Sequence, residues 1–329
     1  MSDDSVFHGD PSDGSEQVPL YQHTKRPGWG LAILAWERNN RRAFQFEDGK
    51  LRLIKDGYYH LMKEVDRPTD AAMDTVAGLQ DKLGVSVARS EIVKDAKARG
   101  KKILTLQDQI KIFRTIYPDG FEGEKWKTDI RGEGDVRRLK RHRNPAIKDA
   151  KENLNKTKIL DMLENRKFSR IVDALLGVLK RTSLVRPVHL EPLKNMPSSR
   201  HEAFAEAFVN YLFGEGGYIA RFDAFVATVC KENPEDCSWL LSTVPAGLLF
   251  PKQQVCVRPG SFRIQARWMA PRLEVSPVPD GRQYMRFRTM AKTIFKNLKD
   301  DGLEPGDLMD VYDFMRLTLK PSAKKLVES

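Results

Sequence analysis

The hydrophobic pattern changes its period near residue 66, and this change most constrains the fold. Between Leu20 and Val65, apolar and polar side chains alternate with a period near two, which is typical of β-strands. From Asp66 onward, apolar residues recur at intervals of three and four, which is typical of amphipathic helices. The pattern predicts a mainly α protein, with a small N-terminal β module followed by a large all-helical body.

Four segments of the N-terminal module have the alternation of strands: 29–37, 42–47, 50–54 and 58–65. Asp48-Gly49 separates the second from the third and predicts a tight hairpin, because these residues tolerate positive φ. Phe44 and Phe46 share one strand face, and Leu51 and Leu53 are expected to join them there. Short antiparallel strands joined by tight turns predict a small SH3-like barrel over 20–66.

Helical periodicity covers most of the chain that follows. Several helix starts carry local signals: Thr105, Asn144-Pro145, a capping box at Ser199–Glu202, and Asp307. The predicted helices are 69–83, 87–99, 105–117, 146–165, 169–181, 200–213, 218–231, 238–249, 261–269, 283–299 and 307–319.

Four regions follow from these patterns. Residues 1–19 carry five acids and no Lys or Arg, and they are expected to be a disordered acidic tail. The tail either only solubilises the chain or competes with nucleic acid for a basic surface. Residues 20–66 are the predicted barrel, 67–135 a helical segment ending in a loop-like linker at 118–135, and 136–329 a helical domain. A short strand is predicted at 253–259.

Charge is the strongest indication of a partner. The chain of 329 residues has a formal net charge of +11, although its first 19 residues are purely acidic. Such a charge favours phosphate-rich or otherwise acidic partners. The start of the chain lacks the pattern of a secretory signal, and the longest apolar run, 239–250, is too short to cross a bilayer. We therefore expect a cytoplasmic location and no membrane association.

The three cysteines, Cys230, Cys237 and Cys256, have neither the even number of a disulfide framework nor the CxxC spacing of a zinc site. They are expected to be free thiols. A mixed site with His189 or His201 would require the fold to gather these residues, which the spacing does not indicate.

The first candidate interface lies on the predicted barrel. Trp29 and Trp36 are seven residues apart and are expected on opposite strand faces, so that one of them lies outside the core. Aromatic rings among basic residues form a surface for base stacking and phosphate contacts. The alternative is that the exposed ring closes the barrel end or packs on the helical body. The basic candidates are Lys25, Arg26, Arg38, Arg41 and Arg42.

The second candidate is the run "RRLKRHRNP" at 137–145, which contains no acid. It precedes a helix predicted to be capped at Asn144, whose N-terminal amides could add a phosphate site. The alternative is a solvated charged surface. The candidate phosphate contacts are Arg137, Arg138, Lys140, Arg141 and Arg143.

The third candidate is 252–299, with eleven Lys or Arg against two acids. Basic residues spaced four apart form stripes along two predicted helices, where they could follow a nucleic-acid backbone. Five aromatic residues are interleaved, and the alternative is that these rings form core while the stripes face water. The candidates are Arg263, Arg267, Arg286, Arg288, Lys292 and Lys296.

No catalytic motif is convincing. Asp48-Gly49-Lys50 fits the end of a metal-nuclease site but has no upstream acid on a partner strand, and "GEGG" at 214–217 lacks the rest of a phosphate loop. Asp307, Asp310 and Asp313 recur at three-residue spacing and could hold a divalent cation, or serve as acids near a helix N-terminus. We assign no catalytic residue, metal or cofactor.

Residues 22–54 resemble the small SH3-like barrels of the Tudor/KOW type found in bacterial transcription and repair proteins. The likeness rests on Arg26-Pro27-Gly28-Trp29-Gly30 before a strand and on Phe44-Gln45-Phe46-Glu47-Asp48-Gly49 at the next hairpin. Ala32 stands where a second glycine is often found. Such barrels contact nucleic acid in some proteins and RNA polymerase in others, as in the CarD-type regulators. The resemblance implies a fold and leaves both kinds of partner open.

Segments of the body between 113 and 315, among them "RHEAFAEAFVNYLFGEGG" and "GDLMDVYDFM", resemble an uncharacterised family of bacterial helical proteins. This likeness carries no activity and no site residues.

The sequence predicts a non-enzymatic nucleic-acid-binding protein of bacterial transcription, repair or defence, with phosphate contacts from the basic segments. The alternative is an adaptor whose barrel docks on RNA polymerase or a repair enzyme. A metal-dependent nuclease with a noncontiguous site is a third hypothesis.

Overall fold

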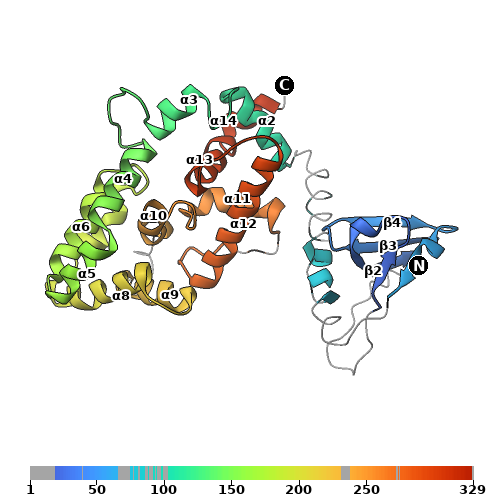
Figure 1. The fold of residues 1–329 in the computed structure, drawn as a ribbon, viewed down its shortest axis with the longest axis horizontal. Helices are drawn as coiled ribbons and strands as arrows, with labels where there is room; N and C mark the ends of the chain where they lie inside the picture. The colour runs from blue at the N-terminus through green and yellow to red at the C-terminus, as the bar shows by residue number, and fades with distance from the viewer. Residues whose placement is uncertain are drawn as a thin grey trace. The chain divides into compact units, whose positions relative to one another are not determined.

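The computed structural model describes residues 19–38, 40–65, 103–230, 238–271, 273 and 275–327, with scattered helical positions between 75 and 98. The chain divides into two compact units, 1–103 and 104–329 (Figure 1). The predicted acidic tail lies outside the described residues except for Pro19, and the predicted helices at 69–83 and 87–99 lie mostly outside them. The described chain is mainly α, with a small N-terminal sheet before an all-helical body, as predicted.

The N-terminal unit contains one antiparallel five-stranded sheet with the order β4-β3-β2-β1-β5. The fifth strand returns to pair with the first, so that β1 lies between β2 and β5. Two 3₁₀ turns, Pro27–Trp29 and Tyr59–Leu61, precede β2 and β5. The strands are β1 Tyr21–His23, β2 Leu31–Arg38, β3 Arg41–Phe46, β4 Leu51–Lys55 and β5 Met62–Glu64.

The predicted strand over 29–37 begins later than expected. Trp29 ends a 3₁₀ turn, and the strand starts only at Leu31, after Gly30 with a φ of +80°. The inference that Trp29 and Trp36 lie on opposite faces of one strand is therefore wrong. The three-residue strand β1 was not predicted, because so short a segment shows no clear alternation.

The hairpin at Asp48-Gly49 also differs in detail. Its turn covers 47–49, closed by a hydrogen bond from the Phe46 amide to the Lys50 carbonyl, and only Gly49 has a positive φ, +81°. The strand register places Leu53 opposite Ala43 and Arg52 opposite Phe44. Because side chains alternate along a strand, Leu51 and Leu53 point away from the phenylalanines and are exposed, contrary to prediction.

The sheet is buried on both faces at β3. One cluster contains Phe44, Phe46 and Ile54, and a second joins Leu31 and Ile33 to Leu79 from the helical positions 78–80. Ala43 and Gln45, on the face opposite the phenylalanines, are fully buried as well. The N-terminal unit therefore has its own core.

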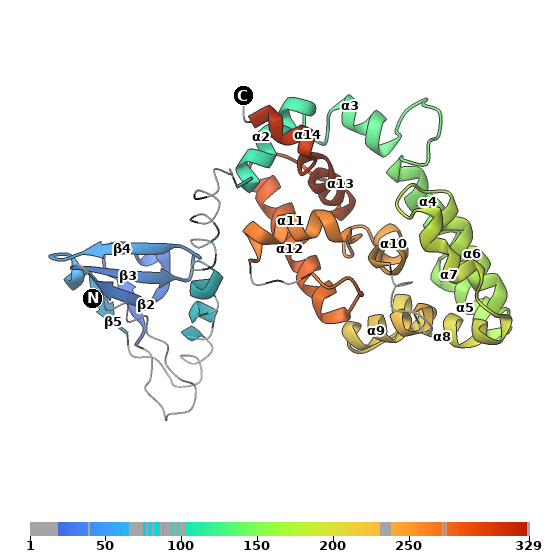
Figure 2. The ribbon, with the colours of Figure 1, turned by 180° about the vertical axis from the view of Figure 1, so that it is seen from behind.

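All the regular elements described in the second unit are helices or helical turns, joined by loops (Figure 2). Short 3₁₀ turns lie at Pro187–Leu190, Ser198–Arg200 and Lys325–Val327, and a π-helical turn at Lys127–Arg131. The helices are α2 Leu106–Ile116, α3 Glu124–Trp126, α4 Arg143–Asn153, α5 Lys156–Glu164, α6 Phe168–Lys180, α7 Glu191–Lys194, α8 His201–Phe213, α9 Tyr218–Val229, α10 Trp239–Leu249, α11 Pro259–Met269, α12 Gly281–Asp300, α13 Leu308–Thr318 and α14 Pro321–Lys324.

Some predicted helix starts are confirmed and others are wrong. Thr105 forms a capping box with Asp108 at α2, and Asp307 accepts two amide hydrogen bonds at α13. The predicted helix 146–165 is two helices, because Asn155 caps a new one. α4 begins one residue before Asn144, since Arg143 is held from inside the core, and no capping box forms at Ser199–Glu202, where a 3₁₀ turn runs directly into α8.

One apolar core runs through the helical body, and α10 lies in its middle in both views (Figure 1, Figure 2). The segment 118–135, predicted as a linker, belongs to this core: Trp126 is fully buried and Ile130 is 7% exposed. The boundary between the two units therefore lies at 103/104, whereas a boundary was predicted at 135/136.

The predicted strand at 253–259 is instead a non-helical segment as far as 258, buried over 254–257, that pairs with no strand among the described residues. Its amides are satisfied by side chains, with the Val255 N–H donating to the Tyr284 hydroxyl at 3.2 Å and the Val257 N–H to the Thr243 hydroxyl at 2.9 Å. No described helix is long and apolar enough to cross a membrane.

The cysteines differ from the prediction of free thiols. Cys230 is disulfide-bonded. Cys256 is a free thiol, as expected, and its burial in the core raises its pKa above the usual value.

Candidate nucleic-acid interface

α12 is a long amphipathic helix whose polar face carries basic residues and, before Asp300, no acid. Asp280 starts it by accepting a hydrogen bond from the Gln283 amide at 2.9 Å. Its apolar face, including Tyr284, Phe287 and Ile294, is buried in the body. No Asp or Glu occurs between 281 and 299. The exposed basic residues are Arg282, Arg286, Lys292, Lys296 and Lys299.

Most of these charges are uncompensated. Within the described part of the chain, Arg282, Arg286, Lys292 and Lys296 have no ion-pair partner, whereas Lys299 pairs with Glu304 at 3.3 Å. We call these four residues the α12 basic face. Like charges held together without counterions attract an external polyanion.

Arg288, also a predicted contact, is half-buried. Its guanidinium lies 5.6 Å from the centre of the Tyr218 ring, so that part of its side chain packs against the body. It is therefore less available to a ligand than the α12 basic face.

The aromatic residues of 252–299 divide between core and surface. Phe262, Tyr284 and Phe287 are fully buried, and the ring centres of Phe262 and Phe287 are 5.1 Å apart. Trp268 and Phe295 are half-buried. For the three buried rings, the alternative of a core role is confirmed.

α11 adds a second group of exposed arginines. Arg263 and Arg267 lie one turn apart, and Arg258 precedes the helix; all three are exposed. None of them forms an ion pair with another described residue. α11 packs on the core through Phe262 and Ala266, and the guanidinium groups of these arginines are left exposed to solvent.

The basic run at 137–143 is mostly a surface loop, as predicted. Arg137, Arg138, Lys140 and Arg141 are exposed. The loop is fixed by a hydrogen bond from the Ser183 amide to the Lys140 carbonyl at 2.8 Å. Arg138 also borders a hollow of about 600 Å³ at the start of α4.

Arg143 is not a surface contact, and this prediction is wrong. The residue is 3% exposed, and its Nε donates to Asp313 Oδ2 at 2.6 Å. Its charge is neutralised inside the protein and is not accessible to a phosphate. His142 is buried as well, and burial, together with the neighbouring Arg141, lowers its pKa.

Asp307, Asp310 and Asp313 form a buried ion-pair cluster with Arg131 and Arg143. Arg131 donates to both oxygens of Asp307, at 2.7 and 3.0 Å, and to Asp310 at 2.8 Å. Residues three positions apart on a helix lie on the same face, so the three acids are close together. Arg131, which precedes α4, and Arg143, its first residue, can therefore together reach all three. The arginine guanidinium groups therefore pair with the carboxylates that were considered, from the sequence, as possible ligands of a divalent cation.

Electrostatics within the cluster are specific. Burial opposes ionisation of Asp313 most strongly, but Arg143 and Arg316 together outweigh it and hold the pKa of this carboxyl below its usual value. Arg316 donates to Asp313 Oδ1 at 2.8 Å. Asp313 is therefore a carboxylate that both arginines anchor.

Sequence reasoning missed this cluster, although a signal was present. In "LMDVYDFM" the two acids stand among large apolar residues, so that a helix burying these residues must also bury the acids. Buried carboxylates require partners, and arginine is the usual one.

The predicted contacts on the N-terminal sheet are partly engaged. Lys25, Arg26 and Arg41 are exposed, whereas Arg42 pairs with Glu37 at 2.9 Å and lies over the Tyr59 ring. The side chain of Arg38 lies outside the described residues.

Trp29 and Trp36 are both half-buried. Trp29 packs edge-on against His23 and Phe46, and the guanidinium of Arg52 lies 4.1 Å from its ring centre. With Arg52 over its ring, Trp29 is not freely available for base stacking.

Among the described residues, no group of three or more His, Cys, Asp or Glu has the arrangement of a metal site. No protein-family model matches the chain, and no curated protein or solved structure is significantly similar to it.

Proposed function

We propose that this protein binds nucleic acid through phosphate contacts that do not depend on base sequence. The observation that carries the proposal is the α12 basic face, on which Arg282, Arg286, Lys292 and Lys296 are exposed and unpaired within the described chain. Lys and Arg on phosphates supply the sequence-independent part of such binding. The proposal places the protein in the cytoplasm, in bacterial transcription, repair or defence.

The dimensions suit a strand of nucleic acid. Arg282 and Lys296 are separated by fourteen positions of a helix, which is about 21 Å at a rise of about 1.5 Å per residue. One strand of a duplex carries a phosphate about every 3.4 Å, so that this length spans about six. The unit 104–329 also holds 39 Lys and Arg against 29 Asp and Glu, which adds long-range attraction.

The test is fluorescence anisotropy with labelled duplex and single-stranded DNA and RNA, from about 50 to 200 mM salt. The logarithm of the binding constant should fall linearly with the logarithm of salt, by about 0.9 for each phosphate neutralised on a duplex. The triple variant Arg282→Gln/Arg286→Gln/Lys296→Gln should bind more weakly and reduce the slope by up to about 3.

A charge-matched control separates a local contact from a general effect of net charge. Lys156, Lys180 and Lys320 are exposed on other elements of the body, and their triple substitution by Gln removes the same charge. This control should retain most of the wild-type slope. Absence of binding at the lowest salt, or equal losses in both triple variants, would refute a site on α12.

A second candidate function is supported by an exposed apolar edge on the N-terminal sheet. β4 is an edge strand, with Leu51 38% and Leu53 52% exposed, and Tyr58 beyond it is 59% exposed. An unpaired edge with apolar side chains is a surface onto which another protein can add a strand. We propose, as the alternative, that this unit is a Tudor/KOW-like module that docks here on RNA polymerase or a repair enzyme; the sequence resemblance at 26–30 and 44–49 supports this.

This alternative predicts binding of purified RNA polymerase or of a repair enzyme with a shallow salt dependence. The double variant Leu51→Lys/Leu53→Lys should abolish it without lowering the stability of the sheet, because both side chains are exposed. Binding of nucleic acid by the same variant should not weaken, because the substitutions add positive charge and leave the α12 basic face intact. If the variant still binds the partner, the edge is not the docking surface.

A further inference from the structure

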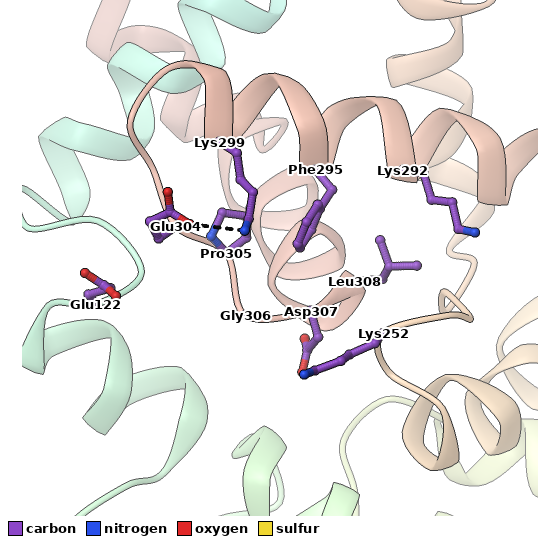
Figure 3. A pocket seen from close by; sticks show the side chains of 10 residues that line it. All are labelled: Glu122, Lys252, Lys292, Phe295, Lys299, Glu304, Pro305, Gly306, Asp307 and Leu308. Carbon is purple, nitrogen blue, oxygen red and sulfur yellow. Dashed lines mark ion pairs between the residues drawn. The ribbon is translucent and has the colours of Figure 1, made fainter.

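A pocket of about 440 Å³ lies beside the α12 basic face, between α12, the turn before α13 and the chain that follows α10 (Figure 3). Its volume is within the range of small-molecule sites, about 300–1,000 Å³. The residues that matter here are Lys252, Lys292, Lys299, Phe295, Asp307 and Leu308.

The basic residues that line this pocket outnumber the acids once the ion pairs within the protein are taken into account. Glu304 is paired with Lys299, and Asp307 accepts two hydrogen bonds from Arg131. Lys252 and Lys292 are exposed and have no ion-pair partner in the described chain. Within the described residues, Glu122 is the one lining acid without an ion-pair partner, so that the two lysines leave a positive charge available for an anion.

Four backbone amides at the N-terminus of α13 are already engaged within the protein. The amides of Met309 and Asp310 donate to Asp307, the Leu308 amide donates to the Pro251 carbonyl, and the Gly306 amide donates to Asp310. The cationic groups that line the pocket and remain available to an anion are therefore lysine side chains.

The pocket also has an apolar wall. Phe295 lies between Lys292 and Lys299 on one face of α12, and Leu308 is close to it (Figure 3). The Phe295 ring is half-buried, and Lys299 Nζ lies 5.4 Å from its centre. A flat aromatic ring next to cations suits a ligand that combines a planar group with a phosphate.

We propose that this pocket binds a nucleoside phosphate, with the phosphate on Lys252 and Lys292 and the base against Phe295 and Leu308. The ligand is either a free nucleotide or the terminal nucleotide of a strand. Only Lys292 is shared with the α12 basic face, so that the pocket can be tested apart from the proposed function.

The experiment uses the full-length protein and two pairs of probes that differ by one phosphate. The first pair is AMP and adenosine, each carrying a fluorescent group on the ribose. The second is a labelled 12-nucleotide strand with either a 5′-phosphate or a 5′-hydroxyl group. Each is titrated by fluorescence at about 50 mM salt, where electrostatic contacts are strong.

The proposal predicts that a probe with the additional phosphate binds at least tenfold more tightly than its partner. Tighter binding of AMP identifies a free nucleotide, and a preference seen only with the strands identifies a strand end. Lys252→Gln should remove the preference, since one charge-assisted contact is worth about tenfold or more. Phe295→Ala should weaken all bound probes.

Lys180→Gln is the matched control, because Lys180 is exposed on α6, outside both the pocket and the α12 basic face, and its substitution should leave the preference unchanged. Lys252 is exposed, so its variant is expected to fold, which keeps the test valid if Phe295→Ala unfolds. Equal binding within both pairs, or a preference that survives Lys252→Gln, overturns the proposal. The triple variant of Arg282, Arg286 and Lys296 loses duplex binding only if the proposed function holds. Failure of the pocket proposal can therefore be distinguished from failure of the proposed nucleic-acid binding.

Discussion

At the scale of single residues, burial determines what an arginine does. Arg143 and Arg141 are two positions apart in one basic run, yet the first is 3% exposed and the second is on the surface. The guanidinium of Arg143 is bound by two oxygens of Asp313, at 2.6 and 2.9 Å. A charge in this position contributes to the fold and not to a ligand.

We expect Arg143→Gln to lower the free energy of unfolding by about 3 kcal/mol, because it leaves the buried Asp313 with only Arg316 as a cationic partner. Arg141→Gln should change it by less than about 0.5 kcal/mol. Urea denaturation followed by circular dichroism measures both. Equal effects of the two substitutions would contradict a structural role for Arg143.

Acid should weaken the same contact. The pKa of Asp313 is lower in the folded protein than in the unfolded chain. Its ion pairs therefore stabilise the fold fully at pH values above the pKa of the unfolded chain. This stabilisation is lost as the pH falls through the pKa of the folded protein. The difference in unfolding free energy between wild type and Asp313→Asn should therefore shrink as the pH falls below about 4. An unfolding free-energy difference that stays constant from about pH 6 to about pH 2, a range that includes the usual pKa of Asp, would exclude this linkage.

At the scale of elements, the central helix α10 is set by close packing. All its residues except Leu240 are buried, and a Cβ on Gly247 would lie 2.6 Å from the Cys256 sulfur. Gly177 in α6 is also inside a helix, but a Cβ there would meet only the end of Arg181 at 3.6 Å. A side chain is therefore excluded by close packing at Gly247 but would fit at Gly177.

We expect Gly247→Ala to destabilise the body by about 1–3 kcal/mol through overpacking. Gly177→Ala should stabilise it by about 0.5–1 kcal/mol, because alanine loses less backbone entropy in a helix. Thermal and urea unfolding of the two variants measure this. A stabilising effect at Gly247 would show that the Cys256 segment yields more readily than its packing indicates.

At the scale of the whole molecule, the two units have separate cores and very different charge. The described buried residues of the body's core begin at Leu106, and those of the N-terminal unit's clusters end at Leu79. Residues 1–103 carry 17 Lys and Arg against 16 acids, so nearly all the excess positive charge lies in 104–329.

A protein consisting of 104–329 should therefore fold by itself and unfold at the same urea concentration as the body in the full chain. It should also retain the salt dependence of nucleic-acid binding, because the α12 basic face is within it. Urea denaturation and anisotropy test both statements. A fragment that is unfolded, or folded without affinity, would contradict the separation of the units.

Local signals in the sequence determined much of the fold. The change of period placed strands before helices, and caps at Thr105, Asn155 and Asp307 act within one turn of the residues that they satisfy. The basic excess over 252–299 and the four-residue spacing of its basic residues likewise made α12 a candidate surface, because helical spacing alone puts basic and apolar residues on opposite faces.

The tertiary structure decided what depends on distant partners. Whether Leu53 points inward depends on its register with Ala43, and whether Arg143 faces solvent depends on an acid 170 positions away. The pocket beside Phe295 is formed by α12, α13 and Lys252, which no local pattern brings together. Burial is a property of the packed chain, so a charge pattern identifies candidate residues but cannot say which of them the fold leaves exposed.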